Sequence, residues 1–150
     1  MSDEIVFRPI GTVRSPYKEP GEAVRQSVSG NERGKIELLP EYAEGLRDID
    51  GFSHIVVVFV FHKSSGASLM AKPPGDGRVH GIFSTRSPHR PNPVGVSVVK
   101  LERISGSTLE VRGIDMIDGT PVIDIKPYIP VLYPRDGVRT GWAENRFSEG

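Results

Sequence analysis

The chain has 150 residues, carries 19 basic and 19 acidic side chains that cancel to a formal net charge of zero, and contains no cysteine. This length is sufficient for one domain with one hydrophobic core, and the zero net charge excludes a molecule-wide field that attracts polyanions, so a nucleic-acid site must be a local basic patch. The lack of cysteine excludes disulfides, thiolate metal ligands and thiol nucleophiles.

The amino-terminal third predicts strands, a loop and a short helix. Residues 5–14 alternate between apolar and polar side chains, which is the period of two of a half-buried strand. Residues 18–33 are charged and follow neither the helical nor the strand period, so they predict a loop that lies over another part of the molecule. Alternation returns over residues 34–39. Residues 39–46, with Pro40 near their start, predict a short helix.

The most apolar stretch, residues 52–62, is β-branched and aromatic and predicts a central strand buried on both faces. Its uninterrupted apolar part, Ile55 to Phe61, is far shorter than the roughly 20 residues that a membrane-spanning helix needs. The amino terminus also lacks the charged-then-apolar form of a secretory signal. We therefore expect a cytoplasmic protein without a membrane span.

Turn residues separate the later strands. Residues 64–78 carry Pro and Gly dipeptides typical of a flexible connection, and strand character returns over 79–83. Residues 94–98 and 109–112 alternate on either side of a Ser-Gly-Ser turn, which predicts a hairpin.

The apolar phase then slips at Gly113, which indicates a β-bulge. Asp118-Gly119 is a turn signal leading into a strand over 121–128, with Ile123 and Ile125 expected on one face. The opposite, polar face carries Asp124, Lys126 and Tyr128. About eight strands, one short helix and an irregular segment over 133–150 predict a mainly β, single-domain, barrel-like fold.

A rigid loop, residues 84–93, follows the strand predicted over 79–83. Its three prolines fix the backbone, so Arg86, His89 and Arg90 could present planar donors to a carboxylate or a phosphate at little entropic cost. A rigid crossover whose arginines lie in water explains the same composition. Composition alone leaves both interpretations open.

Polar residues also occur where the apolar pattern ends. His62-Lys63 follow the buried strand, where side chains can meet a ligand, although a chain re-entering solvent would look the same. No two histidines have the spacing of a metal-binding helix, so we expect no metal site. No G-x-G-x-x-G opens a helix, so a Rossmann-type cofactor site is not supported.

Three aspartates, Asp115, Asp118 and Asp124, surround the predicted turn. Such carboxylates can neutralise a sulfonium, bind ribose hydroxyls or accept a proton. Asp118 is also what the turn itself requires, whereas Asp124, on a strand face, has no such structural reason. Arg25-Gln26-Ser27, in the unpatterned loop, would alone be interpreted as solvated surface.

Four blocks together resemble the TsaA/TrmO family of tRNA methyltransferases. The most specific is F-S-T-R-S-P-H-R-P-N-P-V-G over residues 83–95, and the others are residues 7–18, 51–62 and 115–130. The resemblance covers residues 5–132. The better-known bacterial members continue into a further carboxy-terminal domain.

The resemblance implies a small β-barrel-like fold, unlike the Rossmann-type methyltransferases, that binds S-adenosyl-L-methionine as a homodimer. It implies N6-methylation of threonylcarbamoyl-adenosine at position 37 of tRNA. The family's cofactor contacts would fall on Arg25, Gln26, Ser27, His62, Lys63, Arg86, Val96, Gly113, Ile114 and Asp115.

Roles follow as hypotheses. Arg86 would bind the methionine carboxylate or a nearby phosphate, backbone groups over 113–115 would hold the adenosine, and Asp118 or Asp124 would act as the catalytic carboxylate. His89, Arg90, Lys126 and Tyr128 are candidates for binding the tRNA substrate, whose threonyl carboxylate needs a cation. The alternative function is a regulatory module that binds S-adenosyl-L-methionine or RNA without catalysis.

Overall fold

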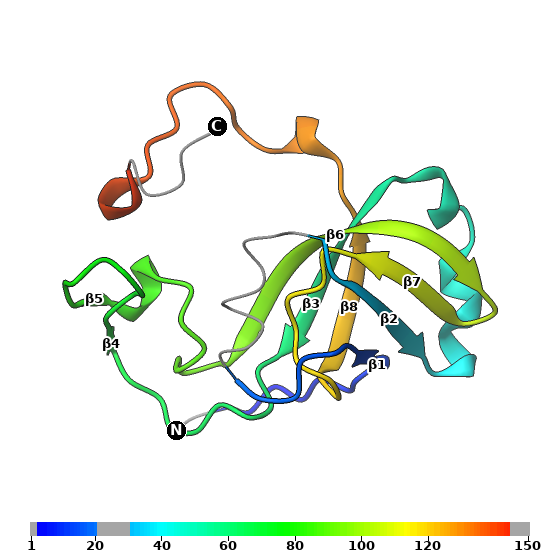
Figure 1. Cartoon of the computed structure of the whole chain (residues 1–150), viewed down its shortest axis with the longest axis horizontal. Helices are drawn as coiled ribbons and strands as arrows, with labels where there is room; N and C mark the ends of the chain where they lie inside the picture. Colours follow the sequence, from blue (N-terminus) through cyan, green and yellow to red (C-terminus); the bar gives the residue numbers. More distant parts are fainter. Residues whose placement is uncertain (1–2, 21–30, 145–150) are drawn as a thin grey trace.

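A closed antiparallel barrel forms the centre of the protein (Figure 1). The computed structural model describes residues 3–20 and 31–144. The barrel strands, in spatial order, are β1 (Gly11–Arg14), β2 (Arg33–Leu38), β7 (Thr108–Arg112), β6 (Val94–Ser105), β3 (His54–Val60) and β8 (Pro121–Pro127). Closure pairs every barrel strand on both sides, which removes exposed sheet edges. The predicted mainly β, barrel-like, non-Rossmann fold is confirmed.

A small two-stranded sheet projects from the barrel as an arm, which we define as residues 68–84. It pairs β4 (Met70–Ala71) with β5 (His80–Gly81), so the strand predicted over 79–83 is confined to two residues. The short helix predicted over 39–46 is present as a 3-10 helix. The described helices are η2 (Pro40–Leu46), η3 (Ile49–Gly51), η4 (Ile82–Ser84), η5 (Pro130–Leu132) and η6 (Gly141–Ala143). No helix in the described ranges is long and apolar enough to cross a membrane.

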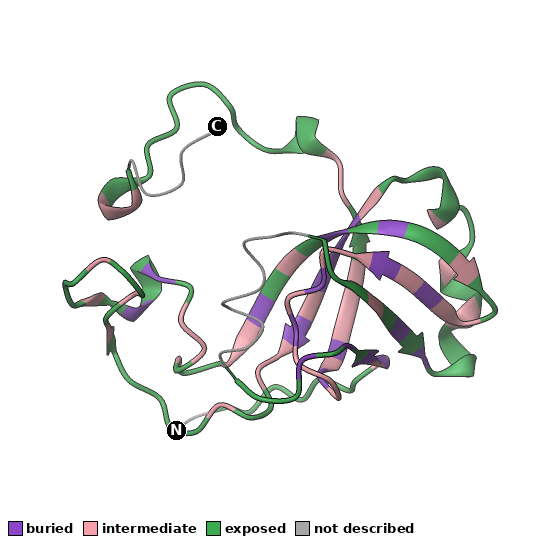
Figure 2. Cartoon of the chain, viewed as in Figure 1, coloured by how far each residue is buried: buried purple, intermediate pink, exposed green. Residues whose placement is uncertain are grey.

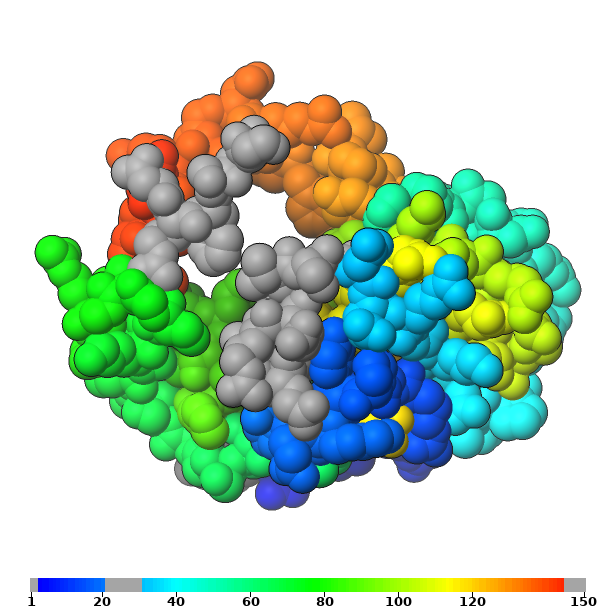
Figure 3. Space-filling model, in the orientation of Figure 1, coloured from blue at the N-terminus to red at the C-terminus, as the bar shows by residue number. Residues whose placement is uncertain are grey.

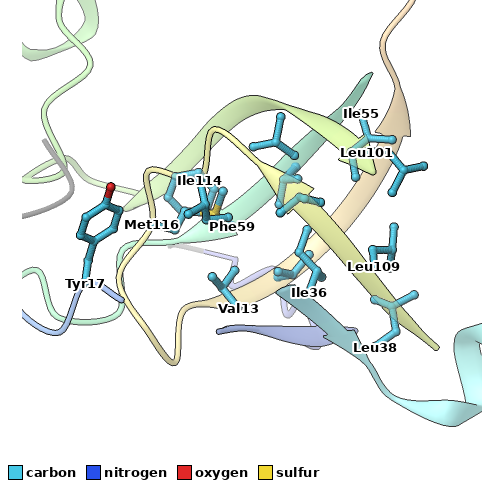
Figure 4. Close-up of a cluster of buried hydrophobic side chains, with 14 residues drawn as sticks. Val13, Tyr17, Ile36, Leu38, Ile55, Phe59, Leu101, Leu109, Ile114 and Met116 are labelled. Carbon is cyan, nitrogen blue, oxygen red and sulfur yellow. The ribbon is translucent and has the colours of Figure 1, made fainter. Parts of the chain in front are cut away.

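Side chains fill the barrel interior. Alternate residues of each strand point inward, as the pleat dictates, and pack into one cluster (Figures 2 and 4). Tyr17 and Met116 close one end of this cluster. Its strand residues are Val13, Ile36, Leu38, Ile55, Val57, Phe59, Val99, Leu101, Leu109, Val111 and Val122.

β3 is central, as predicted, because it pairs with both β6 and β8. Burial on both faces holds only for its first half. Val56 is buried on the outer face, whereas Val58 and Val60 are half-buried. The neighbouring Val96 and Val98 of β6 are each 45% exposed, so the outer surface of these two strands is partly open.

The strand predicted from Ile5 begins only at Gly11. Ile5, Val6 and Phe7 are 70–80% exposed and have no ladder partner. Alternation predicts which face would be buried, but a strand also needs a neighbour, and β1 meets β2 and β8 only from Gly11 onward.

Two irregularities lie elsewhere than predicted. Gly113, with φ of 87°, ends β7 rather than bulging it, and the β6–β7 ladder shifts register between Leu101 and Arg103. In β8 the register shifts opposite Val58 and Phe59. The residue facing inward with Ile125 is therefore Val122, not Ile123 as predicted.

The carboxy-terminal segment, residues 129–144, leaves the far end of β8 and returns to the arm (Figures 1 and 3). The Trp142 ring stacks on His80 with centroids 4.8 Å apart and 17° between planes. The Trp142 Nε1–H donates to the Ser84 carbonyl at 2.7 Å, and His80 Nε2 is 2.6 Å from Asp76 Oδ2. The predicted irregular tail is thus fastened to the arm.

Candidate functional site

One end of the barrel collects most of the candidate residues. Because every neighbouring pair is antiparallel, β1, β3 and β7 end where β2, β6 and β8 begin. We call this end the rim. Its residues are Ser15, Tyr17, Lys18, His62, Lys63, Arg86, Val96, Ser97, Gly113, Ile114, Asp115 and Asp118. Segments far apart in the sequence therefore meet at a single place, as strand ends in sheets often do at binding sites.

Asp115 is a half-buried carboxylate at the rim. Its Oδ1 and Oδ2 accept from the Ser97 hydroxyl at 2.7 and 2.8 Å. Burial raises the pKa of Asp115 above the ordinary aspartate range, and the Ser97 hydrogen bond and the positive charge of Arg86 oppose part of that rise. The carboxylate is therefore fixed in orientation and suited to accept hydrogen bonds from a ligand's N–H or O–H groups.

Arg86 is exposed beside this carboxylate. One guanidinium nitrogen, Nη2, donates to the Val96 carbonyl at 2.9 Å, which ties the proline-rich loop to β6. The guanidinium makes no other hydrogen bond to the described residues, so donors remain for an anion. Val96 itself presents an apolar side chain, 45% exposed, next to this cation.

Asp118 is occupied by the fold. It accepts a hydrogen bond from the Ser15 backbone N–H at 3.0 Å, and Lys18 Nζ lies 3.2 Å from its Oδ2. These contacts, with the backbone hydrogen bond foremost, hold the pKa of Asp118 below the ordinary range. The geometry thus argues against the predicted catalytic role, because such a carboxylate is a weak base.

His62 and Lys63 leave β3 at the rim and stay exposed. A Cβ on Gly119 would lie only 3.7 Å from His62 Nε2, so the imidazole stands over the 118–119 turn. Desolvation, together with the Lys63 charge, lowers the pKa of His62, which favours a neutral ring at neutral pH. Lys63 Nζ donates to the Lys18 carbonyl at 2.9 Å.

The other two candidates of the rigid loop serve the loop itself. Arg90 Nη1 donates to the carbonyls of Thr85 and Ser87 at 2.9 and 3.0 Å. His89 Nδ1 is within 3.3 Å of both the Ser64 hydroxyl and the Ser65 carbonyl. If Arg90 and His89 bind substrate as predicted, the same guanidinium and imidazole must also keep these contacts within the loop.

The polar residues of β8 lie on the barrel exterior. Asp124 pairs with Lys126 at 2.8 Å, and Val58 of β3 pairs with Val96 on one side and with Asp124 on the other, so Asp124 lies at the level of the rim residue Val96. Tyr128 lies past the far end of β8, edge-on to His54 and stacked with Tyr133. The structure therefore separates the predicted substrate residue Tyr128 from the other candidates, because alternation along a strand fixes the face but not the distance.

Arg25, Gln26 and Ser27 lie outside the described residues. Four rim residues, Ser15, Tyr17, Lys18 and Ser97, are not among the predicted site residues. Ser97 occupies an inward position of the valine-rich strand β6. A polar residue at such a position in the sequence is a signal that could have indicated a site residue. Tyr17 sits in a matched block and gave no separate signal.

A basic face covers the barrel exterior beside the rim. Register places Arg33, Arg112 and Lys100 directly opposite one another across β2, β7 and β6. Arg14 and Lys35 form the adjacent row. Like charges on opposing positions destabilise a sheet, so this arrangement favours an anionic ligand.

Acidic residues neutralise only part of the basic face. Glu102 pairs with Arg112 at 2.7 Å, and Glu37 pairs with Arg14 at 2.7 Å. Arg33, Lys35 and Lys100 make no ion pair with any described residue. A shallow groove of about 710 Å³ runs over this face as far as Lys18 and Asp118 at the rim.

Among residues 3–20 and 31–144, no group of three or more His, Asp or Glu side chains is arranged to hold a metal ion.

Comparison with known proteins gives consistent matches. Residues 12–132 match the model of the tRNA-methyltransferase O N-terminal domain. A probable S-adenosyl-L-methionine-binding protein of Pyrococcus abyssi is 45% identical over 141 residues, covering 93% of this chain and 77% of that protein. The tRNA (adenine(37)-N6)-methyltransferase of Escherichia coli is 40% identical over 136 residues, covering 83% of this chain.

The crystal structure of TrmO from Pseudomonas aeruginosa is similar in fold and sequence. It superposes with a TM-score of 0.76 at 37% identity over 93% of this chain. The chain spans 57% of the Escherichia coli enzyme and 62% of the Pseudomonas aeruginosa chain.

Proposed function

The chain belongs to the family of the tRNA-methyltransferase O N-terminal domain, and on that premise we propose that it transfers a methyl group from S-adenosyl-L-methionine to N6 of an adenine in tRNA. The specific acceptor in this proposal is threonylcarbamoyl-adenosine at position 37, and a tRNA substrate would place the protein in the cytoplasm. The observation that carries the proposal is the rim, where the half-buried Asp115 carboxylate and the exposed Arg86 guanidinium lie together.

The chemistry of these side chains fits the cofactor. Its methionine end carries a carboxylate, for which the planar guanidinium of Arg86 is the natural partner. Its adenosine end carries hydroxyl and amino groups that donate hydrogen bonds. The oriented carboxylate of Asp115 can accept such a hydrogen bond. The backbone of residues 113–115, which leaves β7 at the rim, lies beside that carboxylate.

When bound, the cofactor supplies a methyl group on a positively charged sulfur. Methyl transfer is an in-line displacement, so much of the catalysis comes from holding the acceptor nitrogen aligned and close. Arg86 and Asp115 would hold the two ends of the cofactor, which would supply the methyl group to the acceptor nitrogen. That nitrogen would have to lose its N–H proton to a base of the protein.

We propose that the His62 imidazole accepts the N–H proton of the acceptor nitrogen. Its lowered pKa keeps the imidazole neutral at neutral pH, and the side chain is exposed at the rim. Asp118 is held by Ser15 and Lys18, and Asp124 is paired with Lys126 on the barrel exterior. His62 is therefore a better candidate for the base than either predicted aspartate.

The basic face supports an RNA substrate. The whole chain is neutral, yet this face carries Arg33, Lys35 and Lys100 free of ion pairs with described residues. Positive side chains on an open surface bind RNA mainly through phosphates, without reading sequence. The groove on this face reaches the rim, so backbone binding there would lead an RNA strand toward the proposed site.

The arm supports the proposed homodimer. Leu69, Met70, Val79 and Phe83 are 53–77% exposed on this one projection. Several large apolar side chains exposed on one projection favour a protein interface there. We expect sedimentation analysis to show a dimer that Phe83→Asp dissociates, whereas Ile5→Asp, at an apolar position outside the arm, leaves it intact.

Methyl transfer tests the function directly. Purified protein is incubated with methyl-labelled S-adenosyl-L-methionine and tRNA from cells with or without threonylcarbamoylation. Label that enters only the modified tRNA supports the full proposal, and label in both tRNAs supports transfer without the specific acceptor. Several relatives are named only as S-adenosyl-L-methionine-binding proteins. Binding of the cofactor without transfer would favour that second function, a non-catalytic module.

A further inference from the structure

The Tyr17 hydroxyl is a buried donor that the fold leaves unused. The side chain is only 4% exposed, and its Oη has no hydrogen-bond partner among residues 3–20 and 31–144. A buried hydroxyl without a partner is uncommon in folded proteins and destabilises the structure that contains it. Such a hydroxyl either costs the fold stability without a return, or donates a hydrogen bond to a ligand when the ligand is bound.

The Tyr17 ring is held firmly in place. The Asp118 N–H donates to the Tyr17 carbonyl at 2.6 Å, and the Tyr17 N–H donates to the Ser15 hydroxyl at 3.3 Å. The ring packs at the edge of the core cluster, and its hydroxyl points away from Val13 and Ile36 (Figure 4). This donor is therefore fixed in advance, as a binding group should be.

The nearby acceptor is Asp115. Burial raises the pKa of Tyr17, and the charges of Glu32 and Asp115 add to the rise, so the hydroxyl keeps its proton and acts as a donor. Both oxygens of Asp115 accept from Ser97 and neither bonds Tyr17. The Ser15 hydroxyl donates to the Met116 carbonyl at 2.6 Å and the Asp118 N–H donates to the Tyr17 carbonyl at 2.6 Å, so the segments that carry this donor and this acceptor lie side by side at the rim.

We propose that Tyr17 donates a hydrogen bond to N1 of the adenine of S-adenosyl-L-methionine, while Asp115 accepts from the adenine amino group. Adenine carries a ring-nitrogen acceptor beside its N6 amino donor, which is the complement of this pair. This inference rests on the proposed function. It adds a residue that selects the base of the cofactor, a role outside the contacts that the resemblance implies.

Tyr17→Phe removes only the hydroxyl. Calorimetry with S-adenosylhomocysteine, the unreactive product, should show affinity weakened about tenfold, the order expected for one lost hydrogen bond in a dry site. The melting temperature should stay equal or rise, because an unpartnered buried hydroxyl is removed. Tyr42→Phe, on the exposed helix η2, is the matched control and should change neither quantity. Unchanged affinity of Tyr17→Phe overturns the inference.

A second ligand tests the adenine assignment. S-Inosylhomocysteine replaces the amino group with an oxygen, so wild-type protein should bind it more weakly than S-adenosylhomocysteine, and Tyr17→Phe should discriminate less between the two. An equal loss for both ligands would place the hydroxyl on the ribose or the amino-acid part and overturn the assignment. If wild-type protein binds neither S-adenosylhomocysteine nor S-adenosyl-L-methionine, the proposed function fails, and the inference fails with it.

Discussion

At the scale of single residues, three titratable groups of the rim are shifted in different directions by their surroundings. Burial raises the pKa of Asp115, a backbone hydrogen bond lowers that of Asp118, and desolvation lowers that of His62. Groups whose environments push their pKa values apart are typical of sites that bind ligands and move protons. These opposite pKa shifts distinguish Asp115, the proposed ligand-binding carboxylate, from Asp118, which the fold itself uses.

His62 gives the methyl transfer a predicted pH dependence. Its pKa lies below the ordinary value of 6.5, so the neutral base is present at pH 7 and is lost as the pH falls through the lowered value. We expect kcat to fall on acidification and His62→Ala to reduce it about 10²-fold or more at pH 7.5. His54→Ala, at the far end of the barrel, is the control. A flat rate profile, or full activity of His62→Ala, would remove His62 from the chemistry.

Asp118 gives a predicted pH dependence of stability. A carboxylate whose folded pKa is depressed stabilises the fold above its unfolded pKa, and that contribution disappears as the pH falls through the folded value. Asp118→Asn should therefore lower the free energy of unfolding by about 1–2 kcal/mol at pH 7, the range of a charge-assisted hydrogen bond.

Urea unfolding at pH 7 and below pH 3 measures this effect of Asp118→Asn. The difference in the free energy of unfolding between wild type and Asp118→Asn should be smaller below pH 3 than at pH 7. Asp136→Asn, on the exposed tail, should match wild type at both pH values. A gap of the same size at both pH values would contradict an electrostatic role for Asp118.

At the scale of elements, the tail and the arm are held together by one small contact. Trp142, the single tryptophan of the chain, stacks on His80 and bonds Ser84, two residues before Arg86. The tail thus supports the start of the loop that carries the proposed cofactor cation. Intrinsic tryptophan fluorescence consequently reports on this contact alone.

Removing the stacking partner should free the tail. We predict that His80→Ala shifts Trp142 emission to longer wavelength, because the indole becomes more exposed to water, and weakens binding of S-adenosyl-L-methionine severalfold through a less ordered Arg86 loop. His54→Ala should leave the emission spectrum unchanged. An unshifted spectrum for His80→Ala would show that the tail is held by other contacts.

Local sequence patterns predicted the strands and turns better than they predicted which strands pair with each other. The apolar run of β3 predicted a central strand, and the Asp118-Gly119 pair predicted a turn, because both are dictated by neighbouring residues. Strand closure depends on β1 meeting β8 as well as β2, and the β1–β8 contact joins residues over a hundred positions apart, which periodicity does not reveal. For the same reason, alternation assigned Asp124 to a polar face without showing that this residue lies level with Val96 across β3.

The site was predicted unevenly for physical reasons. Blocks of resemblance named Arg86 and Asp115, and the fold brought them together. The role of Ser97 could not be predicted because it depends on a tertiary hydrogen bond to Asp115. The role of Tyr17 could not be predicted because it depends on a buried hydroxyl that finds no partner among the described residues. The Arg90 guanidinium donates to carbonyls of its own loop, a contact that composition does not reveal, and its binding of substrate stays a prediction.

At the scale of the whole molecule, a neutral chain concentrates unpaired positive charge on one barrel face. If RNA phosphates bind there, affinity for tRNA must fall with salt, and each lost contact must reduce that dependence. We predict that Arg33→Glu and Lys35→Glu each weaken tRNA binding and lower the slope of log K against log salt by about one.

Lys72→Glu, an identical charge change on the arm, is the control for tRNA binding measured by filter retention at several salt concentrations. It alters the net charge equally, so an effect of the same size would show that only overall charge matters and would contradict a local RNA-binding face.

The central claim is that the rim binds S-adenosyl-L-methionine through Arg86, and calorimetric titration of the cofactor into wild-type and Arg86→Ala protein tests it most directly. Arg78→Ala, an exposed arginine of the arm, is the matched control. We predict binding by wild type and Arg78→Ala, and affinity lost or reduced more than tenfold in Arg86→Ala that remains folded. Absence of binding by wild type, or equal affinity of Arg86→Ala, would contradict the account.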